Sequence, residues 1–431
     1  MIKKLKRKLS KDLILTELLK GSSLAFIFRI IGIGIGYIFT LLIARWYGAD
    51  TLGLFIISLT LLNIFTTISI FGFDTALVKY IAKYNSKNQN SLINEVYQKA
   101  LIITIILSSL ISLFIFYNAN YISSNIFNNN KLLEFIEIIS FAILPFTYLF
   151  VNLALLRGLK KITLYAFFKN IAITIVSIIL LILLHFFIID NNTIVIYSQF
   201  LAIVVSMIMS FYYVFRTINI SFIFHKILTY KKILKVSFPM LLTSSMILVM
   251  NWSDILMLGM LKNETDVGIY SIAVKIATLI TVPLMAVNVI IAPKFSEFYA
   301  NNNLEGLNNT FRKATKLILL TTLPIIFPLV IFSENLLELY GEEFTMGLVA
   351  LWILIFGQFV NAVSGPVGII LNMTNYHKLN LYINLISIFL NLILNYFLIL
   401  EYGIYGAAIA TSISMVFQNL TKLYYIKKIW G

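Results

Sequence analysis

Long apolar stretches alternate with short polar links along almost the whole chain. Twelve of these stretches reach the roughly 20 residues that a helix needs to cross the hydrocarbon core of a bilayer. We therefore predict an all-α polytopic membrane protein with twelve transmembrane helices. Their approximate limits are 22–44, 51–73, 96–117, 135–156, 162–188, 194–215, 236–258, 267–292, 315–339, 346–371, 379–400 and 404–426.

Composition supports this class and excludes several others. Hydrophobic residues make up 60% of the chain, charged residues make up 12%, and the mean hydropathy is +0.93. These values exclude an ordinary soluble domain. The net charge of +15 does not predict nucleic-acid binding, because the basic residues fall in short runs between apolar stretches. The absence of cysteine excludes disulfides, thiolate metal sites and cysteine nucleophiles.

The placement of charge predicts the orientation. Counted with the nearest link, 28 of the 33 Lys and Arg residues adjoin links of one side, and only Arg45, Lys131 and Lys262 adjoin the other. Cytoplasmic links carry the excess of basic residues. We therefore predict that both termini are cytoplasmic.

The two halves of the chain resemble each other at a constant offset of 215 residues. Six spans per half is an even number, so both halves face the same way, as in a parallel repeat about the membrane normal with a cleft at the interface. We predict a basic amphipathic segment at 1–21 (a solvated basic tail is the alternative), an N-lobe at 22–216, a cytoplasmic linker at 217–235 and a C-lobe at 236–431. The matched positions are Lys20 with Lys235, Ser22 with Ser237, Gly53 with Gly268, Lys79 with Lys294 and Tyr84 with Tyr299.

Asp254, Lys275 and Arg29 fall inside predicted spans, where charge is costly and marks a functional cavity. Asp254 and Lys275 lie at similar predicted depths on adjacent spans, and we expect them to neutralise each other. Arg29 either reaches the inner headgroups or faces the cleft, which we favour because Gly32 and Gly36 share its helical face.

Other motifs receive simpler interpretations. Gly32-x-Gly34-x-Gly36 indicates close packing or bending within a membrane helix, since no strand or following acid makes it a dinucleotide site. Interior prolines at 283, 324, 328 and 366 predict either fixed kinks or points of bending during transport. The three histidines are scattered and no phosphate-binding loop is present. We therefore expect no metal site, no catalytic residues, no ATP hydrolysis and no enzymatic activity.

Several local sequences resemble lipid-linked oligosaccharide flippases of the multidrug/oligosaccharidyl-lipid/polysaccharide exporter superfamily. The strongest are Ser237-Phe238-Pro239, Ser253-Asp254 before Leu258-Gly259, and the segment from Gly268 to Lys275; weaker matches are Leu156-Arg157-Gly158 and the segment from Tyr402 to Ala408.

The resemblance implies two six-helix lobes around a central cleft lined by the first, second, seventh and eighth helices. The implied activity is alternating-access transfer of undecaprenyl-pyrophosphate-linked oligosaccharide repeat units from the cytoplasmic to the outer face of a bacterial inner membrane, for polysaccharide, O-antigen or lipopolysaccharide biosynthesis. The implied partners are this substrate and membrane lipids, with a polysaccharide polymerase as an open possibility, and we expect a monomer. The candidate substrate-binding residues of the cavity are Arg29, Lys275, Asp254, Asn251 and Tyr270.

The membrane potential alone is a sufficient source of energy for such transport. An ionised pyrophosphate in hydrocarbon faces a Born cost of order tens of kcal/mol, so it needs a wet or cationic path. Moving two negative charges outward across about 100 mV releases roughly 4–5 kcal/mol. No cofactor is expected, and proton or sodium coupling stays open.

Four other functions fit the sequence less well. A drug/cation antiporter of the same superfamily needs an acidic cavity, whereas the three intramembrane charges sum to +1. A lipid II flippase usually has two further helices. Polysaccharide polymerases are similar to one another in having a large outer loop, whereas the longest outer loop predicted here, 118–134, is short. The link at Gly72-Phe73-Asp74-Thr75 lacks the basic signature of major facilitator carriers.

Overall fold

The computed structural model describes residues 13–187, 191–217 and 229–430, which form helices, turns and short links without a strand. Most of the predicted N-terminal segment and most of the predicted linker lie outside these residues. The chain divides into two compact units. The first comprises Met1–Ile43 and Ser58–Leu248, and the second comprises Ala44–Ile57 and Val249–Gly431. Two helices, α2 and α9, continue from one unit into the other.

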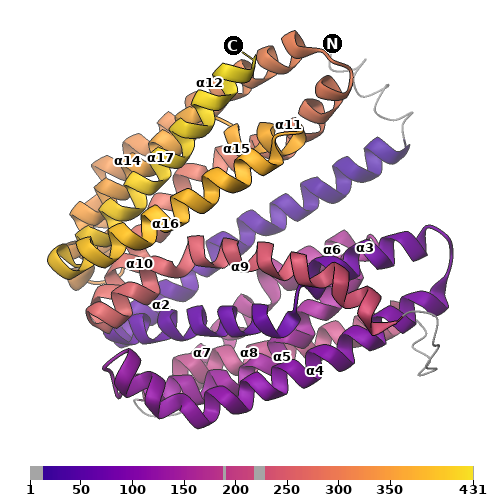
Figure 1. Ribbon diagram of the computed structural model, residues 1–431. Helices are drawn as coiled ribbons and strands as arrows, with labels where there is room; N and C mark the ends of the chain where they lie inside the picture. Colours follow the sequence, from indigo (N-terminus) through magenta and orange to yellow (C-terminus); the bar gives the residue numbers. More distant parts are fainter. Residues whose placement is uncertain (1–12, 188–190, 218–228, 431) are drawn as a thin grey trace. The chain divides into compact units, whose positions relative to one another are not determined.

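Every predicted span coincides with a helix or a short run of helices (Figure 1). The first two spans form the single helix α2 (Leu13–Ile70), which has a break at Gly48 (φ 78°, ψ 176°). The remaining helices of the first unit are α3 (Phe73–Asn85), α4 (Asn90–Tyr121), η1 (Ile122–Ile126), α5 (Leu132–Gly158), α6 (Ile162–Phe167), η2 (Phe168–Ala172), α7 (Ile173–Phe187) and α8 (Ile194–Thr217).

The second unit takes its helices from the C-terminal half. They are the end of α9 (Tyr230–Leu261), α10 (Glu264–Thr278), η3 (Leu279–Thr281), α11 (Val282–Ala300), α12 (Leu304–Ile331), α13 (Ser333–Glu338), η4 (Glu342–Gly347), α14 (Leu348–Ser364), α15 (Val367–Met373), α16 (His377–Tyr402) and α17 (Ile404–Trp430).

Length and hydropathy support a multi-pass membrane protein. Among the described residues, nine helices or helix runs are long and apolar enough to cross a bilayer, and α9 makes a tenth when it is taken as one bent span. The nine include α2 as one long helix, although it contains two predicted spans. The predicted twelfth span is α17, which is 27 residues long but less apolar than the others.

Helix α5 forms the centre of the first unit. It contacts α3, α4 and α8, and most of its side chains are buried. A buried polar chain links three of these helices: Tyr97 on α4 donates to Oδ1 of Asn152 at 2.5 Å, and Nδ2 of Asn152 donates to Ser210 on α8 at 2.9 Å. These hydrogen bonds fix α5 against its neighbours in a region where water is not available to polar groups.

Helix α17 has the corresponding place in the second unit. It contacts α14, α15 and α16, and α16 and α17 run side by side along most of their length (Figure 1). Prolines shape the neighbouring helices. A 3-10 turn, η3, precedes Pro283 near the start of α11, as the predicted kink requires, because proline cannot donate the helical hydrogen bond.

The tenth span ends earlier than its apolar pattern predicts. The predicted limit was Leu371, but α14 ends at Ser364. Gly365 has a φ of 74°, a conformation that glycine adopts without strain, and Pro366 then precedes the separate short helix α15. An apolar run therefore does not always mean one helix.

The break in α2 is bound to polar groups of the second unit. Arg45 Nε donates to the Leu339 carbonyl at 2.6 Å, and Ala49 N donates to Oε1 of Glu343 at 2.7 Å. The Arg45 guanidinium donates hydrogen bonds to carbonyls at the end of α13. The Glu343 carboxylate accepts one from a backbone amide just after the break in α2. This explains why residues 44–57 belong to the second unit.

The internal repeat is visible as a contact between equivalent positions. Gly53 on α2 and Gly268 on α10 are separated by 215 residues, and a Cβ added to Gly53 would overlap the Glu264 carbonyl and approach the amide of Gly268. A Cβ on Gly268 would overlap the Ala49 carbonyl. Asp50 and Thr265, again 215 residues apart, are hydrogen-bonded. Positions matched by the predicted repeat therefore meet at this contact.

Candidate functional site

The most concentrated polar arrangement around a candidate residue is centred on Asp254 of α9. The side chain is 9% exposed. Its Oδ2 accepts hydrogen bonds from Tyr270 Oη on α10 at 3.0 Å and from Thr411 Oγ1 on α17 at 2.5 Å. Neutral hydroxyl groups from two other helices therefore solvate one oxygen of a carboxylate that lies within a predicted membrane span.

The second oxygen of Asp254 faces a third helix, α16. Asn395 Nδ2 donates to Oδ1 of Asp254 at 2.8 Å and to Oδ1 of Asn391 at 3.0 Å. Ser253 Oγ donates to the same Asn391 oxygen at 2.9 Å. We call Asp254, Tyr270, Thr411, Asn395, Asn391 and Ser253 the Asp254 cluster. It joins α9, α10, α16 and α17.

One acceptor in this cluster has no donor within the described part of the chain. Oδ1 of Asn395 is buried without a hydrogen-bond partner there. It belongs to the amide that donates to Asp254. An unsatisfied buried acceptor is costly, so it needs an explanation such as a bound water or ion. The cluster therefore combines one carboxylate with an acceptor that lacks a donor.

A pocket of about 400 Å³, counting the part open to solvent, adjoins the cluster. Asn391 and Thr411 belong to both, so they connect the pocket wall to Asp254. The other lining residues, from α9, α16 and α17, are Met250, Ser387, Ile388, Ser414, Met415 and Gln418. Thr411 thus connects the pocket to Asp254 directly, and Asn391 connects it through Asn395.

The structure brings two of the five sequence-predicted site residues together. Tyr270 contacts Asp254, and both are buried. Asn251 lies one turn before Asp254 on α9 and is exposed. Lys275 is half-buried on α10, five residues beyond Tyr270. Arg29 is exposed on the part of α2 that belongs to the first unit.

The hydrogen bonds of Asp254 come from neutral groups, and Lys275 is not among the donors found for it in the described residues. Helix geometry gives the reason. Five residues correspond to a rotation of about 140° around a helix axis. Tyr270 faces Asp254, so Lys275 points to a different side of α10. The contact that Asp254 is found to make with α10 in the described residues is therefore the hydroxyl of Tyr270.

Sequence reasoning missed Thr411 and did not select Asn391 and Asn395 from the other intramembrane amides. A threonine in a helix usually bonds its own backbone, so Thr411 gave no signal. The two amides did give a sequence signal, because Asn391 and Asn395 are four residues apart and share a helical face. Within the described residues, no group of three or more His, Cys, Asp or Glu side chains is arranged for a metal ion.

Comparison with known proteins adds family information to this geometry. The sequence model of a family described as "Polysaccharide biosynthesis protein" matches residues 18–299, and the MatE model matches residues 239–397. A protein of Haloferax volcanii named "Probable low-salt glycan biosynthesis flippase Agl15" is 28% identical over 177 residues. "Probable flippase AglR" of the same organism is 26% identical over 181 residues. Each match covers 41% of this chain and 38% of the relative, so only about two fifths of each relative is compared.

Solved structures share the fold along nearly the whole chain. An inward-facing multidrug resistance MATE transporter of the MOP superfamily superposes with a TM-score of 0.77 at 14% identity, covering 94% of this chain and 98% of the other. The lipid II flippase MurJ in an inward closed conformation gives 0.71 at 16% identity, covering 95% and 87%. Identities this low show the fold alone.

Proposed function

Because this chain belongs to the polysaccharide biosynthesis protein family, we propose that it is a flippase for lipid-linked oligosaccharides. The observation that carries the proposal is the family match over residues 18–299, joined by two relatives whose names call them probable flippases. The fold shared with membrane transporters supports a transport role rather than an enzymatic one.

We propose undecaprenyl-pyrophosphate oligosaccharide as the substrate and a bacterial inner membrane as the location. The pyrophosphate needs cationic groups along its path, because burying its charge in hydrocarbon is prohibitive. Arg29 in the first unit and Lys275 in the second lie in predicted spans and supply positive charge. With the predicted orientation, outward movement of the anion is downhill in an inside-negative potential.

We further propose that the Asp254 cluster is where a coupling cation acts. One carboxylate surrounded by neutral oxygen and amide groups suits a proton or a monovalent cation such as sodium, and the unpartnered oxygen of Asn395 supplies a further acceptor. Loss or gain of a proton at Asp254 changes whether its oxygens accept the hydrogen bonds from Tyr270 and Thr411.

Gene deletion tests the proposed activity. The deletion strain should accumulate lipid-linked repeat units on the cytoplasmic face and lose surface glycan, while glycosyltransferase activity in isolated membranes persists. Complementation by the wild-type chain should restore both. Single repeat units transferred at the outer surface would instead identify a polymerase, and the flippase proposal would be wrong.

The structural similarity to a multidrug transporter makes a drug/cation antiporter the second candidate. It predicts a different phenotype. Deletion would then raise sensitivity to cationic drugs and leave surface glycan unchanged. Measuring drug sensitivity and surface glycan in the same strains separates the two functions.

A further inference from the structure

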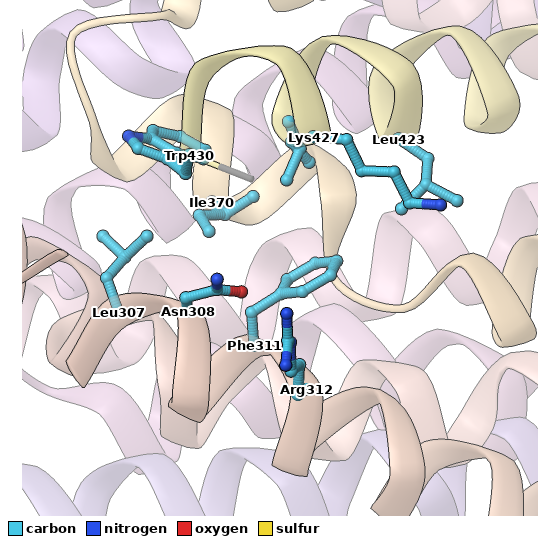
Figure 2. Close-up of a pocket in the computed structure, with 9 residues that line it drawn as sticks. Leu307, Asn308, Phe311, Arg312, Ile370, Leu423, Lys427 and Trp430 are labelled. Atoms are coloured by element: carbon cyan, nitrogen blue, oxygen red, sulfur yellow. The ribbon is translucent and has the colours of Figure 1, made fainter. Parts of the chain in front are cut away.

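A groove lies in the second unit between the start of α12 and the end of α17, with α15 between them (Figure 2). It encloses a space of about 570 Å³, counting the part open to solvent. Its walls are mostly apolar, and its polar lining residues are Asn308, Arg312, Lys427 and Trp430. The apolar lining residues are Leu307, Phe311, Ile370, Leu423 and Ile426. The groove shares no residue with the Asp254 cluster.

Two cations from different helices line this apolar groove. Arg312 lies beside Phe311 on α12, and Lys427 lies on the facing side of the groove on α17 (Figure 2). Both side chains are exposed, and neither forms a hydrogen bond or an ion pair with another described residue. In the segments 304–316 and 422–430, Glu305 is the only acidic residue, against six basic ones. The groove is therefore a positively charged site with apolar walls.

The groove lies at the predicted depth of the lipid headgroups. Arg312 comes three residues before the predicted ninth span, and Lys427 comes directly after the last one. The distribution of basic residues predicts that both positions are on the cytoplasmic side. Trp430 packs edge-to-face on Tyr376 with ring centroids 5.5 Å apart. Aromatic side chains of this kind are enriched at the membrane–water interface.

We propose that this groove binds an anionic phospholipid of the inner leaflet. The phosphate lies between Arg312 and Lys427, and an acyl chain follows the apolar wall that includes Phe311 and Ile370. Charge complementarity selects this occupant. A zwitterionic lipid brings its own cation, which the two basic residues repel, and a free phosphate leaves the apolar walls uncovered. Basic pockets between membrane helices on the cytoplasmic side bind anionic headgroups for this reason.

The test measures lipid binding to the purified full-length protein in detergent by native mass spectrometry. Phosphatidylglycerol and phosphatidylcholine with identical acyl chains are compared. Wild-type protein should retain phosphatidylglycerol preferentially. Each cation near a membrane surface contributes about a five-fold change in affinity, so Arg312→Gln with Lys427→Gln should bind phosphatidylglycerol about thirty-fold more weakly.

The matched control is Lys313→Gln with Lys428→Gln. It removes the same formal charge from the neighbouring positions, which are exposed and do not line the groove. The control should keep wild-type binding. Equal losses of phosphatidylglycerol binding in the two double variants would show attraction by general surface charge and would overturn the proposal. Equal retention of the two lipids by the wild type would overturn it as well.

A third variant tests the apolar wall without changing charge. Leu423→Trp fills the groove from a half-buried position, and it should weaken phosphatidylglycerol binding while the melting temperature without lipid stays near that of the wild type. Undiminished binding would place the lipid elsewhere. Inorganic phosphate is the last arm: if it raises the melting temperature as much as the phospholipid does, the site takes a phosphate group alone and the lipid assignment is wrong.

Discussion

Asp254 receives its hydrogen bonds from residues as distant in sequence as Thr411, which is 157 positions away. Hydrogen bonds to a charged group contribute about 1.5–3 kcal/mol each, so the cluster stabilises both the carboxylate and the packing of four helices. The sequence identified Asp254, because a carboxylate within an apolar span is energetically costly and therefore easy to recognise. It did not identify the donors, because hydroxyl and amide groups are common in membrane helices and their partners depend on tertiary packing.

Asp254→Asn should destabilise the protein, because the introduced amide nitrogen is a donor facing other donors. We expect a loss of about 2–4 kcal/mol in the free energy of unfolding, measured by denaturation in detergent. Adding Lys275→Gln should not restore stability, since the lost partners are neutral. Full recovery in the double variant would show that Asp254 and Lys275 form a pair after all. Asn251→Ala, exposed on the same helix, is the control and should leave stability near that of the wild type.

Tyr270→Phe and Thr411→Val should show coupled effects, because both hydroxyls donate to Oδ2 of Asp254. Each single variant leaves one donor, whereas the double variant leaves that oxygen without either. The double variant should therefore lose more stability than the sum of the singles, with a coupling energy of about 0.5–3 kcal/mol. A double-mutant cycle on the free energy of unfolding measures this coupling. Strict additivity would mean that the two hydroxyls act independently of each other.

At the scale of the helix, hydropathy and proline predicted most helix positions and irregularities, and small residues explain the helix ends and contacts that were missed. Each apolar run predicted as a span coincides with a helix or a run of helices in the described part of the chain, and Pro283 marked a true irregularity. The end of α14 was missed because Gly365 and Pro366 lie within an apolar run. Lys99 was counted with an inner link, but it is buried in α4 and paired with Glu95 one turn away. A charge count does not detect such an internal pair.

Gly53→Ala tests the close approach of α2 and α10. The added Cβ would overlap the backbone of Glu264, so the helices must separate. We expect a destabilisation of about 1–3 kcal/mol, typical of overpacking, seen as a lower melting temperature. Gly34→Ala is the matched control, because no atom other than its own helix backbone and chain neighbours lies within 4 Å of its added Cβ. Its alanine should be neutral or slightly stabilising. Equal effects at the two glycines would contradict the close packing.

At the scale of the molecule, the alternation of apolar and polar stretches is enough to predict a polytopic all-α protein, because a bilayer leaves few alternatives to the helix. The fold shared with MATE and MurJ structures agrees with that expectation. The orientation depends on basic residues outside the spans, whose distribution is strongly asymmetric. This predicted orientation can be measured directly.

Single cysteines can measure the orientation without background, since the chain contains no cysteine of its own. Asn90→Cys and Asn309→Cys, both in links predicted inside, should resist a membrane-impermeant maleimide in intact cells and react after lysis. Asn130→Cys, in a link predicted outside, should react in intact cells. All three positions are exposed, so burial does not limit the reaction. The reverse labelling pattern would invert the topology.

The contact between Gly53 and Gly268 is shared by matched positions of the two halves. A Cβ on Gly53 would overlap the carbonyl of Glu264. A Cβ on Gly268 would overlap the carbonyl of Ala49, which lies 215 residues before Glu264. Asp50 and Thr265, matched in the same way, are hydrogen-bonded one turn earlier. Each glycine therefore makes room for the backbone of the opposite helix, so a mutation of either one opens the same contact from the opposite side.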